Sequence, residues 1–561
     1  IDRSRGLGDV YKRQIYYVII DKKMNDIKKN KSKRYKNIVK KSKFWPIVQL
    51  FKDRNRFMNE VSQKSQKKIL EKIKQKDLYE EIINTVYKEK LRISNISWKA
   101  DPVDDKRFWY KLKEKIIEFE EDKNNPKIRK EILPMIINRY TKEITGNFKR
   151  SHHGFARRLI TSFLARLLNT ARLRNPFGSL NLDSTIQIVG KYKRLRKLSK
   201  NGTIIMVPTH FSHLDSALIG WIISQLGLPA FMYGAGLVLY NLKIFAYFFN
   251  SLGAYKVDRR KKHLLYLETL KTYTERAIVN GCNNLFYPGG TRSRSGAIEK
   301  NLKLGLLGST IEAQRELDNK NKKIYIVPVT FNYQFVLEGP ALINQYLSKN
   351  QNNRSHLKDL GYSNTFKIFT FLIKYFTRSN RMAVSIGNPL DIYGNIVDNK
   401  GKAINKNNLS IKKNNKTEIL NKLSEKIIDE LMAGTVVYSS LILSFTSFEL
   451  IRKKFKKMDI QNLIALPEDE LTISLKYFKP KYKQVMDYIL KLSQDKKIKL
   501  SDELSLSIED QIKIGCKNLG LYHAIRPIEL ENNILIIKNI KMLFYYRNRL
   551  DGYKIENILK T

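Results

Sequence analysis

The sequence predicts an α/β fold, with a mixed, largely parallel central sheet flanked by helices. Two observations predict it. Short apolar runs of strand length recur through the middle of the chain, and stretches with helical spacing separate several of them. Apolar runs that alternate with helices are typical of a sheet buried on both faces. The expected strands are residues 186–189, 203–207, 230–233, 284–287, 325–329 and 383–386, and the helices between them include residues 215–225 and 264–280.

The region before this layer is predicted to be helical. In residues 15–129, Ile82, Ile83 and Val86 have helical spacing, and lysines occupy the solvated face. Residues 1–14 (IDRSRGLGDVYKRQ) resemble translated sequencing-adapter sequence. We therefore interpret them as probable non-native sequence and set them aside from the fold, as one would a fusion scar.

The remaining boundaries follow from composition. Residues 130–394 are expected to hold the α/β domain, which begins with a helical stretch up to residue 174. Residues 395–416 are rich in Asn, Lys and Gly and are predicted to be a linker. Residues 417–561 are predicted to be a helical C-terminal region. It opens with an apolar stripe at every fourth position, at residues 419, 423, 427 and 431.

The chain is strongly basic. Its 561 residues include 105 Lys and Arg against 53 Asp and Glu, a formal net charge of +52. Such a charge attracts nucleic acid, an anionic membrane face or acidic ligands, although AT-rich codon usage accounts for part of it. The lysines are diffuse and no recognised nucleic-acid motif is present, so we expect no nucleic-acid binding. Two cysteines, Cys282 and Cys516, make no disulfide framework and fit a reducing compartment.

Two apolar segments raise the question of a membrane. Residues 216–242 carry no charge over 27 positions, which is long enough for a membrane span. Glycines and a proline interrupt the segment, so we favour a buried core or an apolar tunnel that touches the membrane. Residues 366–376 (FKIFTFLIKYF) are aromatic and flanked by cations. They fit an interfacial helix or a buried helix equally well.

The segment HFSHLD, residues 210–215, offers a base and a carboxylate. It connects the expected strand at residues 203–207 to the helix that follows. Open α/β sheets bind ligands beyond the carboxyl ends of their strands. Asp215 at the helix start can bend back to accept a hydrogen bond from His210. That bond would orient the imidazole and stabilise its charged form. His210 could then act as general base toward a substrate hydroxyl.

Two later segments place arginines beside glycines. GAYKVDR (residues 253–259) ends in Arg259, and YPGGTRSR (residues 287–294) carries Arg292 and Arg294. Adjacent glycines let the backbone approach an anion, and arginine binds phosphate through a bidentate fork. A base, an orienting carboxylate and a phosphate clamp are the parts that transfer an acyl group to a phosphate-bearing alcohol.

The first segment leaves other interpretations open. His213 is an alternative base, and His210 with His213 could bind a metal. No further His, Cys or carboxylate cluster accompanies them at ligand spacing, so we expect no metal. A His and an Asp at this spacing also arise often by chance, and it is the two arginine segments that favour a functional site.

Taken in order, these segments resemble the blocks of the glycerol-phosphate acyltransferase superfamily. This superfamily includes glycerol-3-phosphate, dihydroxyacetone-phosphate and lysophosphatidate acyltransferases. Residues 210–215 match its His-x4-Asp block, residues 253–259 the second block and residues 287–294 the third. The apolar run at residues 326–329, which contains Pro328, matches the fourth. Order and spacing agree across roughly residues 146–393.

Flanking segments extend the resemblance to the long members of the superfamily. Residues 136–148, 435–445 and 544–548 look like the flanks of enzymes that acylate glycerol 3-phosphate or dihydroxyacetone phosphate. The short lysophosphatidate enzymes lack these regions. The resemblance therefore favours glycerol 3-phosphate as the acceptor, with lysophosphatidate as the alternative.

The resemblance also implies roles and partners. His210 and Asp215 would be catalytic, with acyl-CoA or acyl carrier protein as donor, an anionic membrane surface as partner, and neither cofactor nor metal. We expect a membrane-associated enzyme at the cytoplasmic face. Amides near Gly290 and Thr291 would stabilise the oxyanion. The expected substrate-binding residues are Arg259, Gly290, Thr291, Arg292, Ser293 and Arg294, and Gly253 and Pro328 would support the motifs or the acyl groove.

One position departs from the superfamily. The third block normally carries Glu where this chain has Gly289. Either the loop is shaped differently, or Glu299 or another acid takes that place. A non-catalytic scaffold that kept the fold is the reading that this departure supports, and substitution of His210 would distinguish it.

Overall fold

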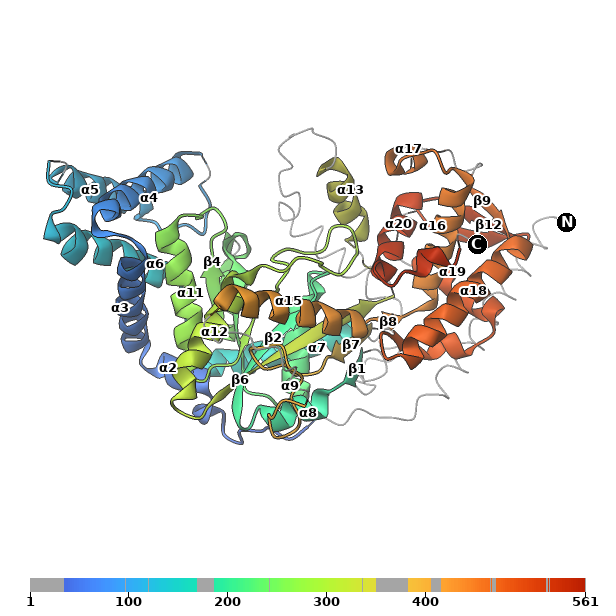
Figure 1. The fold of residues 1–561 in the computed structure, drawn as a ribbon, viewed down its shortest axis with the longest axis horizontal. Coiled ribbons are helices and arrows are strands. Elements are labelled where there is room, and N and C mark those ends of the chain that lie inside the picture. Colours follow the sequence, from blue (N-terminus) through green and yellow to red (C-terminus); the bar gives the residue numbers. More distant parts are fainter. Residues whose placement is uncertain are drawn as a thin grey trace.

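In the computed structural model, an α/β domain lies between a helical N-terminal region and a C-terminal region, which sit at its opposite ends (Figure 1). The adapter-like residues 1–14 and the aromatic residues 366–376 are outside the described set, so the expectations for them stay predictions. The structure describes residues 35–95, 97–119, 121–168, 186–241, 243–334, 336, 338–349, 382–404, 415–464, 466, 471–520, 523 and 525–559.

The α/β domain is built on a sheet that, within the described residues, has seven strands in the order β1-β7-β6-β2-β5-β3-β4. Neighbouring strands are parallel except for β6 and β7. The predicted mixed, largely parallel sheet is confirmed, and β4 is the strand that the sequence analysis missed. The strands are β1 (Ile186–Gly190), β2 (Gly202–Pro208), β3 (Met232–Gly236), β4 (Ala254–Val257), β5 (Asn284–Leu285), β6 (Lys323–Tyr333) and β7 (Met382–Ile386).

Helices cover both faces of this sheet, which is why its strands are apolar without alternation. In β2, Ile204 and Met206 belong to one core and Ile205 and Val207 to another. The first core includes α9, and the second includes α12 and α15. The helices of this domain are α8 (Tyr192–Leu198), α9 (Leu214–Gln225), η4 (Leu237–Asn241), α10 (Lys243–Leu252), α11 (Leu264–Val279), α12 (Leu304–Asp318), α13 (Gly339–Lys349) and α15 (Lys416–Ala433).

The N-terminal region is helical, and its helices α3 and α6 pack on α11. Ion pairs reinforce that contact: Lys72 Nζ lies 2.6 Å from Glu268 Oε2, and Arg276 Nη2 lies 2.6 Å from Glu60 Oε1. The elements are η1 (Ser42–Phe44), α2 (Pro46–Lys52), α3 (Arg54–Lys72), α4 (Gln75–Asn95), α5 (Asp105–Ile117), η2 (Ile128–Ile132), α6 (Leu133–Ile144) and α7 (Arg150–Leu168).

The C-terminal region shares one core with the α/β domain. Its central helix α16 is buried on every side from Ser439 to Ile451. Ile419, Leu423, Ile427 and Leu431, the predicted stripe on α15, are all buried. The antiparallel sheet β11-β12-β9 was not predicted. The elements are β8 (Val436–Val437), α16 (Ser439–Lys454), α17 (Ile460–Ile464), β9 (Thr472–Ser474), α18 (Leu475–Gln494), β10 (Lys499–Leu500), η6 (Asp502–Ser505), α19 (Ile508–Gly520), β11 (Ile528–Glu531), β12 (Ile534–Ile537), α20 (Ile540–Arg547), η7 (Asn548–Leu550) and η8 (Ile555–Asn557).

The uncharged residues 216–242 are divided among several elements. Most of α9, all of β3 and all of η4 come from this stretch. In the part of the chain that the structure describes, no helix combines the length and apolar character that crossing a membrane requires.

Candidate active site

The three chemistry-bearing segments meet at one edge of the sheet. They follow β2, β4 and β5, and these strands run in the same direction, so their carboxyl ends share an edge. Two hydrogen bonds to backbone carbonyls join the segments. The Ser293 amide donates to the His210 carbonyl at 2.7 Å, and the Arg259 guanidinium donates to the Gly290 carbonyl.

His210 and Asp215 form the expected pair. His210 Nδ1 lies 2.9 Å from Asp215 Oδ2, and the Asp215 side chain is fully buried. The same oxygen accepts the amides of Phe211 at 2.7 Å and Ser212 at 2.9 Å. The Tyr333 hydroxyl donates to Asp215 Oδ1. Because Asp215 Oδ2 accepts a hydrogen bond from His210 Nδ1, this contact favours the tautomer with hydrogen on Nδ1 and leaves Nε2 to accept a proton.

A tyrosine fixes the plane of the imidazole. The Tyr287 ring stacks on His210, with centroids 4.1 Å apart and planes 24° apart. Its hydroxyl lies 3.3 Å from Ser216 Oγ on α9. Burial raises the pKa of Tyr287, so the phenol stays neutral beside the base. Sequence reasoning quoted Tyr287 as part of a motif but gave it no role.

Glu338 links two of the segments and was also missed. It accepts the Ser212 hydroxyl at 3.1 Å and the His213 amide at 2.9 Å. Arg292 Nη1 lies 3.7 Å from the same carboxylate. Asp215 pairs with His210, so the geometry favours His210 over His213 as base. No sequence signal near Glu338 could have identified it, because it lies more than 120 residues beyond Ser212.

The other predicted site residues divide into two groups. Arg259 is exposed at the site, whereas Ser293 is buried and its hydroxyl donates to the Ala297 carbonyl at 2.7 Å. Ser293 therefore shapes the loop. The Gly290 amide, at a φ of +76°, donates to the Tyr287 carbonyl at 2.9 Å. Because that amide is already used, Thr291 is the remaining amide of the two proposed for the oxyanion.

Gly253 and Pro328 have roles in the packing of the sheet. Gly253 has a φ of +98°, and a Cβ there would lie 2.9 Å from the Phe231 carbonyl oxygen. Pro328 lies inside β6, paired with Val207 of β2, and its carbonyl accepts the Gly387 amide at 2.9 Å. Both residues thus support the sheet that carries the site.

Glu299 occupies the space beside Gly289. A Cβ added to Gly289 would lie 2.7 Å from Glu299 Cγ and 3.0 Å from its Oε1. Burial raises the pKa of Glu299, although Lys303 and Arg294 oppose that shift. A carboxyl group therefore lies beside position 289 even though the residue there is glycine.

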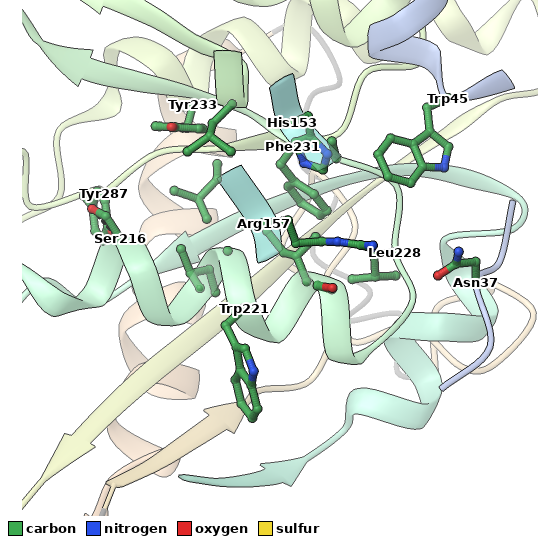
Figure 2. Close-up of a pocket in the computed structure, with 17 residues that line it drawn as sticks. Asn37, Trp45, His153, Arg157, Ser216, Trp221, Leu228, Phe231, Tyr233 and Tyr287 are labelled. Atoms are coloured by element: carbon green, nitrogen blue, oxygen red, sulfur yellow. Dashed lines mark hydrogen bonds between the residues drawn. The ribbon is translucent and has the colours of Figure 1, made fainter. Parts of the chain in front are cut away.

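An apolar pocket begins beside the His210–Tyr287 stack. Together with the open solvent at its mouth, the space between its lining residues is about 870 Å³. Figure 2 shows Tyr287 and Ser216 at one end, Asn37 and Trp45 at the other, and Phe231 between them. Six residues of α9 line it, and all but Trp221 lie on one helix face: Ser216, Ile219, Gly220, Ile223 and Ser224.

In the part of the chain that the structure describes, the cysteines and metal candidates do not form a second centre. Cys282 is fully buried, and burial raises the pKa of its thiol. Among the described residues, no group of three or more His, Cys, Asp or Glu is arranged to hold a metal ion.

Comparison with known proteins agrees with this arrangement. Residues 190–332 match the model of the Acyltransferase family. The chain is 29% identical over 221 residues to the glycerol-3-phosphate acyltransferase of Alteromonas mediterranea, which covers 39% of this chain and 25% of that protein. It is 34% identical over 148 residues to that of Baumannia cicadellinicola, covering 26% of this chain and 18% of that protein.

A third relative extends the match beyond that domain. The chain is 25% identical over 413 residues to the glycerol-3-phosphate acyltransferase of Pseudoalteromonas translucida, covering 73% of this chain and 44% of that protein. In each case the matched region covers less than half of the relative. Residues 190–332 thus match the Acyltransferase family, within a chain that is similar to a glycerol-3-phosphate acyltransferase over 73% of its length.

Proposed function

We propose that this chain transfers a fatty acyl group from a thioester to a hydroxyl of glycerol 3-phosphate. The observation that supports this best is the His210–Asp215 pair, stacked against Tyr287 at the end of an apolar pocket. A base for the hydroxyl, arginines for the phosphate and a pocket for the chain lie around one point. The reaction proposed for this site is typical of the proteins that the chain resembles.

His210 starts the reaction by accepting the proton of the acceptor hydroxyl at Nε2. Asp215 stabilises the imidazolium that forms, because its carboxylate is buried and held by four donors. General base catalysis of this kind contributes about 10²–10⁴-fold to a rate.

The acceptor oxygen then attacks the thioester carbonyl. The new C–O bond forms, the C–S bond breaks, and the thiol leaves with the proton that His210 returns. The Thr291 amide is the candidate donor to the oxyanion, a contribution of about 3 kcal/mol in comparable sites. The apolar pocket along α9 would hold the acyl chain while this happens.

Arginines at the sheet edge would bind the acceptor phosphate. Arg259 and Arg292 come from different segments, and the contact of Arg259 with Gly290 brings them to one loop. Arg294 lies close enough to Glu299 to oppose the rise that burial causes in the pKa of that carboxyl group. Lysophosphatidate carries the same phosphate, so it remains the second candidate acceptor, and the length of the similarity to glycerol-3-phosphate acyltransferases favours glycerol 3-phosphate.

The donor and the location belong to the same proposal. Both acyl-CoA and acyl carrier protein present a thioester next to acidic groups, which a chain of net charge +52 attracts. The same charge favours an anionic leaflet, at about 1 kcal/mol per well-placed basic residue. We propose a membrane-associated enzyme that works at the cytoplasmic face without metal or cofactor, because a thioester is already activated.

The test uses purified protein, labelled acyl-CoA and anionic vesicles, with glycerol 3-phosphate or lysophosphatidate as acceptor, beside His210→Ala. We expect lysophosphatidate from glycerol 3-phosphate, and a loss of at least about 10³-fold in the variant. Product from lysophosphatidate alone would move the enzyme one step later. No product with either acceptor, with acyl carrier protein also tried as donor, would support a scaffold.

A further inference from the structure

Arg549 is a buried cation that the site described above does not use. It lies in η7, directly after α20 in the C-terminal region, and its exposure is 6%. Its guanidinium carbon lies 3.2 Å from the centre of the Phe211 ring, the residue next to His210. Within the described residues, its Nη1 finds no hydrogen-bond acceptor. An unsatisfied buried guanidinium is costly, so fold stability alone does not account for it.

The charge of Arg549 acts on Asp215. Burial lowers the pKa of Arg549 to about 10, and the nearby Tyr545, Tyr553 and Asp215 oppose that shift. The guanidinium is therefore protonated at neutral pH. The other titratable or charged groups around the His210–Asp215 pair are Tyr333, Tyr287, Tyr545, Glu338, Arg292 and His213. Arg292 is partly compensated by Glu338 at 3.7 Å.

We propose that Arg549 is a positioning residue for the His210–Asp215 pair, and that it makes the C-terminal region part of the active site. The buried guanidinium lies over Phe211, next to His210, and its positive charge attracts the Asp215 carboxylate. The same charge repels a second positive charge on the neighbouring imidazole. This inference rests on the proposed role of His210 as a base.

Neighbouring contacts support this placement. Asn548 Nδ2 donates to the Ser295 carbonyl at 3.0 Å, just beyond the arginine loop. A Cβ at Gly296 would lie 2.1 Å from the Tyr545 carbonyl oxygen, so the loop and α20 meet backbone to backbone. The C-terminal region thus contacts the site in two places, at Phe211 next to His210 and just beyond the loop that carries Arg292 and Arg294.

The experiment replaces the charge and measures protonation of His210. Arg549→Met keeps the length and removes the cation, and Arg549→Gln is the second variant should the first not fold. The readouts are the acid limb of kcat/KM against pH, and the pH dependence of His210 modification by diethyl pyrocarbonate, followed by peptide mass spectrometry. The second needs no turnover, so it reports on Arg549 even if the proposed reaction is wrong.

Removal of a nearby cation makes the imidazolium easier to form. We expect both readouts to move to higher pH by about one unit in either variant, and to return toward the parent in Arg549→Lys. The matched control is Arg547→Met, which removes a buried arginine that pairs with Glu449 at 2.7 Å. Arg547→Met should lower the melting temperature of the protein and leave the pH dependence of both readouts unchanged. An unchanged titration in a folded Arg549 variant would overturn the proposal.

Discussion

At the scale of single residues, the glycine at position 289 and the glutamate at position 299 form one unit. A side chain at position 289 would make the Glu299 side chain shift, because a Cβ at Gly289 would come within 2.7 Å of Glu299 Cγ. In this chain the carboxyl group beside position 289 comes from Glu299, ten residues later. Glu299 lies near Arg294, so it can orient an arginine proposed to bind phosphate.

The contact between positions 289 and 299 predicts how substitutions at these two positions change activity. Gly289→Glu alone should lose activity, because the new side chain collides with Glu299. Glu299→Gln should lower kcat/KM for glycerol 3-phosphate by about tenfold, the effect of weakening one charged contact of about 1.4 kcal/mol. Gly289→Glu combined with Glu299→Gly should recover activity relative to the first variant. Equal activity of Glu299→Gln and the parent would show that the carboxylate has no role.

At the scale of elements, α9 contributes to the site in two ways. Its N-terminal turn carries Asp215, and the face with Ile219 and Gly220 lines the apolar pocket. A glycine inside a helix costs about 1 kcal/mol relative to alanine. Gly220 has open space where a Cβ would be, so its small size keeps the pocket wide along the helix.

Filling that space should change which acyl chains fit. We expect Gly220→Ala to stabilise the fold by about 0.5–1 kcal/mol with little change in donor preference. Gly220→Phe should reduce turnover of a 16-carbon donor at least about tenfold and spare an 8-carbon donor, because the ring occupies the pocket. Gly305→Leu, at an exposed helical glycine of α12, is the control. Equal loss of turnover with both donors would show that this pocket does not hold the acyl chain.

The same scale shows what the sequence could predict. The expected strands appear as apolar runs because both faces of the sheet are buried, and His210 and Asp215 could be paired because they are five residues apart. β4 escaped notice because it is short, lies at the sheet edge and contains Lys256. Tyr333 reaches Asp215 across 118 residues, and only the fold brings such residues together.

At the scale of the whole molecule, part of the diffuse positive charge lies next to the apolar pocket. A groove beside α7 is lined by cations, and it shares Asn37, Trp45 and Arg157 with the far end of the apolar pocket. Phe155 in the groove is 59% exposed. Cations around exposed apolar side chains are the composition that binds an anionic lipid surface. The groove cations are Lys40, Lys149, Arg150, Arg157 and Arg158.

If acyl chains enter from the lipid side, this groove should dominate membrane binding. Arg150→Glu with Arg158→Glu should weaken sedimentation with phosphatidylglycerol vesicles by at least about tenfold, at about 1 kcal/mol per basic residue. Lys476→Glu with Lys483→Glu on exposed positions of α18 changes the net charge equally and should matter less. Raising the salt concentration should weaken vesicle binding by the parent protein toward that of the groove variant, because salt screens the same contacts. Equal weakening by both pairs would mean that binding follows total charge, and the groove would then have no special part in bringing lipid to His210.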